Sequence, residues 1–165
     1  EHLDWDGEGK MLDIGCGAAA LTVRCAKAFP KAQITAMDYW GAEWSYAKEQ
    51  CERNVRLESV ADRVSFQKGD AAKLDFADET FDAVVSRNLT WNLEDPGQAY
   101  KEWIRVLKKG GILLNYDANW YHHLFDAEKR EEYETEISGL CSGFSGKKRN
   151  NRLFYGGWRW GNASE

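Results

Sequence analysis

The sequence predicts a doubly wound α/β fold built on a mostly parallel β-sheet. Short apolar segments alternate with amphipathic helical segments from residue 10 to residue 117, the order that a parallel sheet with helical crossovers requires. The first apolar segment runs into the turn Gly15-Cys16-Gly17, and a helix-prone run of alanines follows it. A strand that leads through a glycine turn into a helix is typical of α/β proteins that bind adenosine-containing cofactors.

The first half of the chain contains three expected strands and two expected helices. Strands are predicted over 10–14, 32–37 and 63–67, because each is a short apolar run bounded by polar or turn residues. Helices are predicted over 19–28 and about 43–55, because apolar side chains recur there every three or four residues. These side chains are Leu21, Cys25 and Ala28 in the first helix and Trp44, Ala47, Cys51 and Val55 in the second.

The next helix has the clearest ends. Asp95 is a favourable N-cap, and Pro96 occupies the first helical position, where its missing N–H does no harm. Lys108 and Lys109 suit the negative end of the helix dipole, and Gly110 can adopt the left-handed cap. We therefore expect the helix to extend as far as these lysines.

The remaining segments complete the predicted organisation. A strand over 80–86 is apolar enough to be buried on both faces, and a fifth strand is expected over 111–117. Helical spacing of apolar residues in a charged segment predicts a surface helix over 125–138. The predicted arrangement is one domain over 1–140 and an irregular C-terminal tail over 141–165.

Composition restricts the classes of partner. The chain has 165 residues, enough for one compact domain, and a formal net charge of −5, which gives no support to nucleic-acid binding. No segment approaches the roughly 18 apolar residues of a membrane span, so no membrane partner is expected. The four cysteines lack metal-ligand spacing, so we expect no metal, reduced thiols and a cytoplasmic location. The oligomeric state is not predicted.

Polar residues occupy the carboxyl ends of all five expected strands. Parallel strands bring these ends to one edge of the sheet, where doubly wound proteins bind their ligands. We expect a functional site at this edge, formed from Asp13, Gly15 and Gly17, from Asp38, from Asp70, from Ser86, Arg87 and Asn88, and from Asp117, Asn119 and Trp120.

The glycine turn fits two cofactors. The segment 15–20 satisfies a variant of the dinucleotide fingerprint G-x-G-x-x-A. However, Asp13 lies two residues before the first glycine, where a carboxylate is unfavourable beside a pyrophosphate and favourable beside an ammonium group. S-adenosylmethionine carries an ammonium, a sulfonium and no phosphate, so the residues favour this cofactor. Asp13 could instead cap the following helix, and Arg87 could simply pair with a carboxylate.

From about Lys10 to Trp120 the chain resembles the class I S-adenosylmethionine-dependent methyltransferases, in particular the small-molecule enzymes of the type 11 domain. The resemblance depends on five segments that occur in the family's order. They are Leu12-Asp13-Ile14-Gly15-Cys16-Gly17, the acid Asp38, Gly69-Asp70-Ala71, Phe81-Asp82-Ala83-Val84-Val85-Ser86, and Arg105-Val106-Leu107-Lys108-Lys109-Gly110-Gly111.

The resemblance implies a role for each matching residue. The loop with Asp13, Gly15 and Gly17 would hold the methionine moiety, and Asp38 would bind the ribose hydroxyls. Tyr39 would lie against the adenine, whose amino group and ring edge would contact Asp70 and the Ala71 backbone. Arg87 and Asn88 would line the methyl-transfer cavity. The implied cofactor-binding residues are Asp13, Gly15, Cys16, Gly17, Asp38, Tyr39, Gly69, Asp70, Ala71, Arg87 and Asn88; no catalytic residue is assigned.

The chain departs from the family's pattern in three respects. Ala19 stands where a third glycine is usual, which predicts a tighter or shifted loop, and Lys109 replaces a common proline. The helix before the first strand and the hairpin after the fifth have no counterpart here, which indicates a Rossmann-like methyltransferase sheet truncated at both ends. The expected function is methyl transfer to a small molecule; the alternatives are an inactive cofactor-binding domain and a nicotinamide-dependent oxidoreductase.

Overall fold

The computed structural model describes residues 5–41, 48–117, 127–131 and 134–135. The chain divides into two compact units, Glu1–Trp120 and Tyr121–Glu165. In the second unit the described residues are helical and exposed, as expected for the surface helix over 125–138. The expected tail over 141–165 lies outside the described residues.

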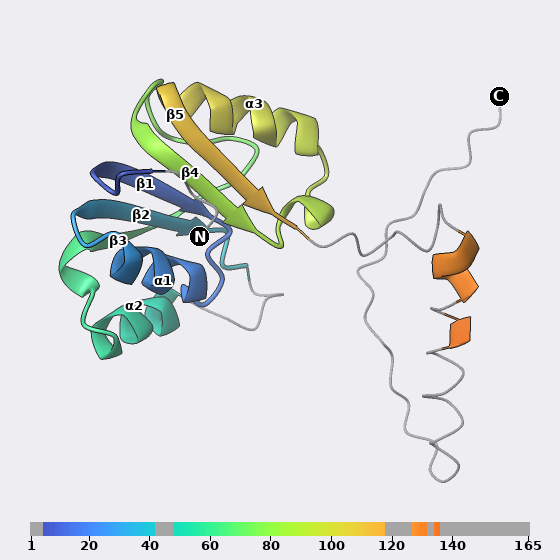
Figure 1. Ribbon diagram of the computed structural model, residues 1–165, viewed down its shortest axis with the longest axis horizontal. Helices are drawn as coiled ribbons and strands as arrows, with labels where there is room; N and C mark the ends of the chain where they lie inside the picture. Colours follow the sequence, from blue (N-terminus) through green and yellow to red (C-terminus); the bar gives the residue numbers. More distant parts are fainter. Residues whose placement is uncertain (1–4, 42–47, 118–126, 132–133, 136–165) are drawn as a thin grey trace, which may run out of the picture. The chain divides into compact units, whose positions relative to one another are not determined.

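Five parallel strands form the sheet of the first unit, which confirms the predicted fold class (Figure 1). They are β1 (Gly9–Ile14), β2 (Ala32–Asp38), β3 (Val64–Lys68), β4 (Phe81–Arg87) and β5 (Leu107–Tyr116). Their order is β3-β2-β1-β4-β5, with every neighbouring pair parallel. The strand order therefore reverses between β1 and β4, where doubly wound sheets bind ligands at the carboxyl ends of their strands.

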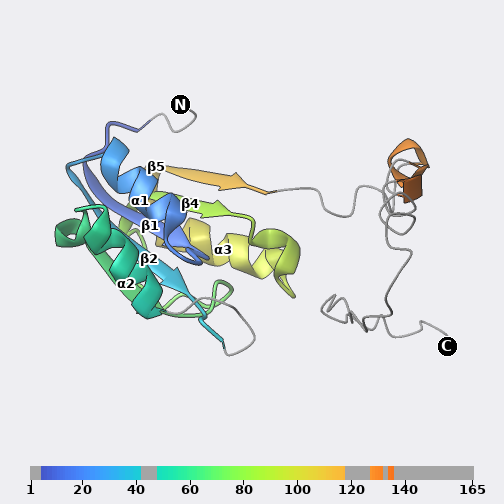
Figure 2. The ribbon, with the colours of Figure 1, turned by 90° about the horizontal axis from the view of Figure 1, so that it is seen from below.

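Helices cover both faces of the sheet. The helices α1 (Ala20–Ala28) and α2 (Lys48–Leu57) lie on one face, and α3 (Pro96–Val106) lies on the other (Figures 1 and 2). Two short 3₁₀ helices, η1 (Ala61–Arg63) and η2 (Thr90–Asn92), precede β3 and follow β4. Residues 43–47 of the expected second helix lie outside the described part of the chain. Within that part, no helix combines the length and apolarity needed to cross a membrane.

Alternation along β1 supplies a core on each face of the sheet. Met11 packs into the cluster formed with α1 and α2, whereas Leu12 and Ile14 pack into the cluster that contains Trp103 of α3. All of these side chains are fully buried. Asp13 occupies the same strand and is only 1% exposed, so an ionisable side chain lies in a core position.

The end of α3 differs from the prediction. The helix ends at Val106, and β5 begins at Leu107 in register with the start of β4. Lys108 and Lys109 therefore lie in the strand and not at the helix end. Gly110 adopts a φ of +78°, but at a bulge where the pairing of β5 with β4 shifts. Pairing with the neighbouring strand outweighs the local preference for another helical turn.

The connection between β3 and β4 is an irregular loop, residues 69–80, and not a helix. The loop buries Leu74 in the core beneath α3, and the partly buried Phe76 packs against that core. Among the described residues, no helix covers the β2–β3 part of the sheet on the α3 side. Met37 packs into the core there, and the Ser65 hydroxyl donates to the Thr35 hydroxyl at 3.4 Å.

Candidate functional site

The glycine turn after β1 is attached to the end of β2. The N–H groups of Gly15 and Cys16 both donate to the Met37 carbonyl, at 2.9 and 3.0 Å. Gly15 has a φ of +74°, and a Cβ built on it would lie 2.9 Å from Leu89 Cδ2. Glycine is required here for two reasons, since a side chain would strain the backbone and collide with the loop that follows β4.

Ala19 adopts the conformation that a glycine would adopt. Its φ is +67° and its ψ is 26°, in the left-handed region, although its methyl group is fully buried. Its N–H donates to the Cys16 carbonyl at 2.8 Å, which closes the turn at the start of α1. The departure from the family's third glycine is thus accommodated by backbone strain of about 1–2 kcal/mol.

Asp13 lies beneath this turn and is incompletely partnered. Its Oδ2 accepts a hydrogen bond from the Thr22 hydroxyl of α1 at 2.5 Å. Its Oδ1 is buried and has no hydrogen-bond partner among the residues that the structure describes. Burial raises the pKa of this carboxyl to about 6, with the charge of Asp38 acting in the same direction and the hydrogen bond from Thr22 acting against both. The bond to Thr22 agrees in part with the alternative in which Asp13 serves the following helix, yet one oxygen remains for another ligand.

Asp38 lies at the end of β2 and holds the turn from the other side. Its Oδ2 accepts from the Gly17 N–H at 2.8 Å, and its Oδ1 accepts from the Trp40 N–H at 3.2 Å. The Trp40 indole donates to the Gly17 carbonyl at 3.4 Å and packs edge-on against Phe66. Two carboxylates therefore flank one short backbone turn, and the charge of Asp38 acts on Asp13.

Cys16 fills the interior of the turn. It is buried, and the thiol of Cys51 in α2 donates to the neighbouring Gly17 carbonyl at 2.9 Å. A hydrogen bond with Cys51, together with burial, raises the pKa of the Cys16 thiol. A protonated thiol of this kind packs the loop and is a poor nucleophile.

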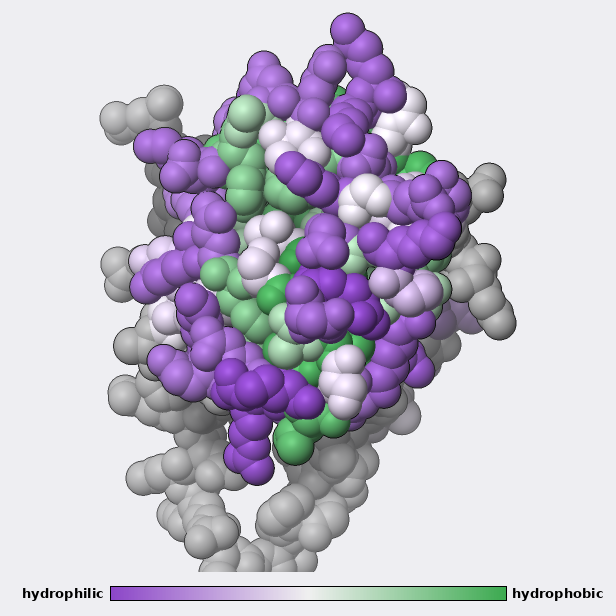
Figure 3. All heavy atoms as spheres, turned by 90° about the vertical axis from the view of Figure 1, so that its left-hand side faces the viewer, coloured by the Kyte–Doolittle hydropathy of each residue, from purple (hydrophilic) through white to green (hydrophobic). Residues whose placement is uncertain are grey.

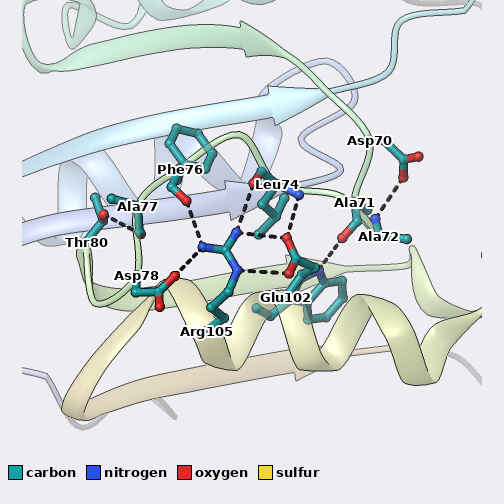
Figure 4. Close-up of polar contacts among 11 residues, drawn as sticks. Asp70, Ala71, Ala72, Leu74, Phe76, Ala77, Asp78, Thr80, Glu102 and Arg105 are labelled. Carbon is teal, nitrogen blue, oxygen red and sulfur yellow. Dashed lines mark hydrogen bonds and ion pairs between the residues drawn. The ribbon is translucent and has the colours of Figure 1, made fainter.

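The end of β3 carries a tight turn. The Gly69 N–H donates to the Asp38 carbonyl at 3.0 Å, which ties this turn to the end of β2. Asp70 Oδ1 accepts from the Ala72 N–H at 2.8 Å, and the Ala71 carbonyl accepts from the Trp103 indole at 2.9 Å. Figure 4 shows the second carboxylate oxygen of Asp70 directed away from this turn.

Tyr39 follows β2 and is largely exposed. Its side chain is 56% exposed, and the Lys68 ammonium lies 5.2 Å from its ring centroid. The Lys68 side chain thus lies beside the Tyr39 ring, and this ring is exposed enough for a ligand to contact it.

The ends of β4 and β5 meet the prediction only in part. Arg87 and Asn88 are exposed, and Asn88 has a φ of +55° with its N–H bonded to the Tyr116 carbonyl at 3.0 Å. Ser86 is buried instead, and its hydroxyl donates to the Ile14 carbonyl at 2.9 Å. Asp117 accepts from the Thr90 N–H at 2.6 Å, so it caps η2. The other candidates after β5, among them Asn119 and Trp120, lie outside the described residues.

A groove of about 270 Å³ lies at the opposite edge of the sheet, near the amino ends of the strands. Its lining includes Lys10, Thr35, Arg63 and Thr80. Figure 3 shows the face seen from that side, where apolar and neutral side chains form a strip within a largely hydrophilic surface. The predicted site residues lie at the carboxyl edge, away from this groove.

Comparison with known proteins identifies the family of the chain. A family model described as a methyltransferase domain matches residues 12–115. The chain belongs to this family. The resemblance to class I S-adenosylmethionine-dependent methyltransferases is thereby confirmed, and the nicotinamide-dependent alternative is wrong, because the match spans both carboxylates and the glycine turn.

Individual methyltransferases show the same relationship. The chain is 33% identical to the sterol 24-C-methyltransferase erg6 of Aspergillus fumigatus, over 66% of this chain and 27% of that protein. It is 32% identical to the ubiquinone/menaquinone biosynthesis C-methyltransferase UbiE of Desulfotalea psychrophila, over 67% of this chain and 42% of that protein. A phosphoethanolamine N-methyltransferase 2 of Haemonchus contortus, solved with S-adenosyl-L-methionine, is 28% identical with a TM-score of 0.57, covering 66% of this chain and 24% of that one.

The chain therefore spans less than half the length of the curated methyltransferases that it matches, between 27% and 42% for these two. The family match covers the five-stranded sheet from β1 to β5. The residues there fit S-adenosylmethionine, because a buried carboxylate oxygen without a partner suits an ammonium group better than a phosphate.

Sequence reasoning missed the residues that position this methyltransferase loop. Thr22 of α1 bonds to Asp13 just before the turn, and Leu89, after β4, lies where it would collide with a Cβ on Gly15. The sequence does offer an indication of the role of Thr22, which is a threonine one turn into an otherwise apolar helix face. It offers none for Leu89, because the position of Leu89 depends on how two distant segments pack.

Proposed function

We propose that this chain binds S-adenosylmethionine at the carboxyl edge of its sheet and transfers the methyl group to a small-molecule acceptor. The observation that carries the proposal is the pair of carboxylates, Asp13 and Asp38, beside the glycine turn. They are close enough for the charge of Asp38 to raise the pKa of Asp13. Such a pair repels a pyrophosphate and attracts a ligand with two positive charges and no phosphate.

The two carboxylates have separate tasks in this proposal. Asp13 Oδ1, buried without a partner, accepts a hydrogen bond from the α-ammonium group, directly or through water. Asp38 accepts from the ribose hydroxyls while its bonds to the Gly17 and Trp40 N–H groups hold it in place. The turn at Gly15 has no side chain, so the methionine moiety can approach the backbone closely.

The adenine would lie between β2 and β3. Tyr39 offers an exposed ring face, and Asp70 has one carboxylate oxygen outside its own turn, available to the adenine amino group. The Ala71 carbonyl is already bonded to Trp103, which leaves the Ala71 N–H for the ring edge.

The bound cofactor supplies a methyl group on a sulfonium, which is already a good leaving group. The chain's contribution is therefore to hold donor and acceptor in line and to exclude water. Arg87 and Asn88 lie at the end of β4, where we place the acceptor side of the site. No general base is assigned. A small-molecule acceptor is supported by the names of the sterol and ubiquinone relatives.

Titration calorimetry with S-adenosylhomocysteine tests the proposal directly. Asp38→Ala should weaken binding by about 1.5–3 kcal/mol, because hydrogen bonds to a charged group are lost. Asp62→Ala is the matched control, since Asp62 is an exposed carboxylate beside the groove at the other edge. A folded sample that gives no heat at millimolar ligand would end the proposal, and an Asp38→Ala variant with unchanged affinity would remove Asp38 from the site.

Turnover needs its own measurement. Mass spectrometry of a panel of small acceptors, incubated with S-adenosylmethionine, should detect a methylated product. Cofactor binding without any product favours the alternative of a cofactor-binding domain that performs no chemistry.

The wider setting of the domain also remains a proposal. We propose that the cofactor-binding domain extends over residues 1–140. Of the described cysteines, Cys16 and Cys25 are free thiols, which fits the reducing cytoplasm that we propose as its location.

A further inference from the structure

The loop between β3 and β4 has few backbone bonds of its own beyond its first turn. Asp70 to Lys73 form that turn, closed by the Ala72 N–H on Asp70 Oδ1 at 2.8 Å and by the Lys73 N–H on the Asp70 carbonyl at 3.1 Å. Beyond it the chain runs without a helix to β4. The position of this loop is therefore set by its hydrogen bonds with side chains of α3.

One ion pair on α3 holds the exit of this turn. The Leu74 N–H donates to Glu102 Oε2 at 2.9 Å, and the Leu74 carbonyl accepts from Arg105 Nη2 at 2.9 Å (Figure 4). Glu102 and Arg105 are themselves joined by two bonds, Nε to Oε1 at 2.9 Å and Nη2 to Oε2 at 2.8 Å. Both backbone groups of Leu74 are thus fixed by one bidentate pair.

Arg105 also fixes the next part of the loop. Its Nη1 donates to the Phe76 carbonyl at 2.8 Å and to Asp78 Oδ1 at 2.7 Å. Together with the Trp103 indole on the Ala71 carbonyl, α3 holds the loop at Ala71, Leu74 and Phe76 (Figure 4). Arginine suits this task because its planar fork can bond a carboxylate and two carbonyls at once, which a lysine ammonium cannot match in geometry.

The pair is charged over the whole physiological pH range. Hydrogen bonds from Arg105 lower the pKa of Glu102 to about 2. Hydrogen bonds to Glu102 and Asp78 raise the pKa of Arg105 above its ordinary value. Glu102 is 17% exposed and Arg105 is 31% exposed, so water competes little for the carboxylate.

We propose that Arg105, with Glu102, is a positioning residue that holds the Asp70–Ala71 segment in the geometry that selects adenine over other purines. The proposal rests on the function proposed above, in which this segment contacts the adenine. Arg105 touches no ligand. It acts because the turn that carries Asp70 has its exit clamped at Leu74, so the free Asp70 oxygen keeps one direction.

The test compares the affinities of S-adenosylhomocysteine and S-inosylhomocysteine, in which a keto oxygen replaces the adenine amino group. The wild-type chain should favour the adenosyl ligand by about 10-fold or more, since the amino group donates to a charged acceptor. Arg105→Lys keeps the positive charge but loses the fork, and we expect the preference to fall below about 3-fold. Lys101→Gln, an exposed position on the same helix, should keep the wild-type preference.

A double-variant cycle separates positioning from general loosening. Asp70→Asn alone should abolish the preference, and adding Arg105→Lys should then leave the ratio of affinities unchanged. If Arg105→Lys does not fold, Glu102→Gln replaces it, since this variant keeps the arginine and removes the charged partner. Hydrogen exchange at the Ala72, Lys73 and Leu74 amides should also quicken in these variants and not in Lys101→Gln.

The outcomes distinguish the two proposals. A wild-type chain that binds neither ligand overturns the proposed function itself. A wild-type chain that prefers the adenosyl ligand, with the same preference in folded Arg105→Lys and Glu102→Gln, overturns only the positioning role. An equal loss of affinity for both ligands overturns it as well, because loosening without loss of purine selection is a structural effect.

Discussion

Asp13→Asn should remove a pH dependence from the stability of the ligand-free protein. In the folded chain the carboxyl has a pKa of about 6, against an ordinary value of 3.8, because it is buried beside another carboxylate. A raised pKa means that the folded state holds the proton more tightly than the unfolded state. The stabilisation is therefore complete below about pH 4 and is lost as the pH rises through about 6.

The size of the effect follows from the shift. A difference of about 2 pKa units corresponds to about 3 kcal/mol of unfolding free energy, since each unit is worth about 1.4 kcal/mol. Asparagine is nearly isosteric, can still accept from the Thr22 hydroxyl and does not titrate. Its buried amide costs about 1–3 kcal/mol if unpartnered, but this cost does not vary with pH. The difference between variant and wild type should thus shift by about 3 kcal/mol in favour of Asn between about pH 4 and pH 7.

Urea unfolding followed by tryptophan fluorescence measures this difference at a series of pH values. Comparing the two proteins cancels every group that titrates equally in both. Asp62→Asn, at an exposed carboxylate, is the control for the same chemical change at the surface. A profile for Asp13→Asn that is flat to within about 0.5 kcal/mol would refute the argument that this carboxyl is buried and strained.

The same substitution should act in the opposite direction on ligand binding. Calorimetry at about pH 8 should find S-adenosylhomocysteine bound more weakly to Asp13→Asn than to the wild type, because the ammonium loses a charged partner. The wild-type affinity should also rise as the pH passes about 6, where the free carboxyl ionises. Unchanged affinity in the variant would show that Asp13 stabilises the start of the following helix and does not contact the ligand.

Three further changes test other parts of the site. Gly15→Ala should destabilise the fold by about 2 kcal/mol or more in urea unfolding, because the backbone is left-handed there and the added Cβ would collide with Leu89. The variant should also lose ligand binding. A stable variant that binds the ligand would show that the turn tolerates a side chain. Ala19→Gly should change the free energy of unfolding by less than about 1 kcal/mol. The release of backbone strain is offset by the loss of a buried methyl group and by the greater entropy of the unfolded chain. A larger change in either direction would contradict the proposed strain at Ala19. Glu102→Gln should flatten the loss of stability on acidification that the wild type shows as the pH falls from about 4.5 through 2, because the folded-state pKa is depressed; an identical acid profile would argue against the ion pair.

The features that were predictable from sequence are those set by neighbours along the chain. The glycine turn, the acids at the ends of β1 and β2, and the N-cap Asp95 each follow from a local pattern, and the last accepts from the Gln98 N–H at 2.9 Å as a cap should. Charge alone favoured the correct cofactor, because the sign of a carboxylate next to the turn does not depend on the tertiary fold.

The features that were not predictable depend on contacts between distant segments. Ser86 was expected at the ligand edge, but a strand buried on both faces gives no local indication of where a small polar side chain points. The sequence predicts a longer α3 than the structure has. Its helical pattern gives no indication that Leu107 pairs with β4. The clamp on Leu74 comes from Arg105, 31 positions along the chain, and nothing in either segment announces the other.

The hydrogen bonds that Asp38 already makes have a consequence for the thermodynamics of recognition. Its carboxylate is held by two backbone donors, so the ribose binding that we propose for it need not freeze a rotating side chain. An unrestrained side chain at that position would forfeit about 0.5–1.5 kcal/mol of affinity in lost rotamer entropy. The acid is preorganised by the same glycine turn that it helps to shape, so evolution of tighter or looser binding can proceed through the turn without altering the acid itself.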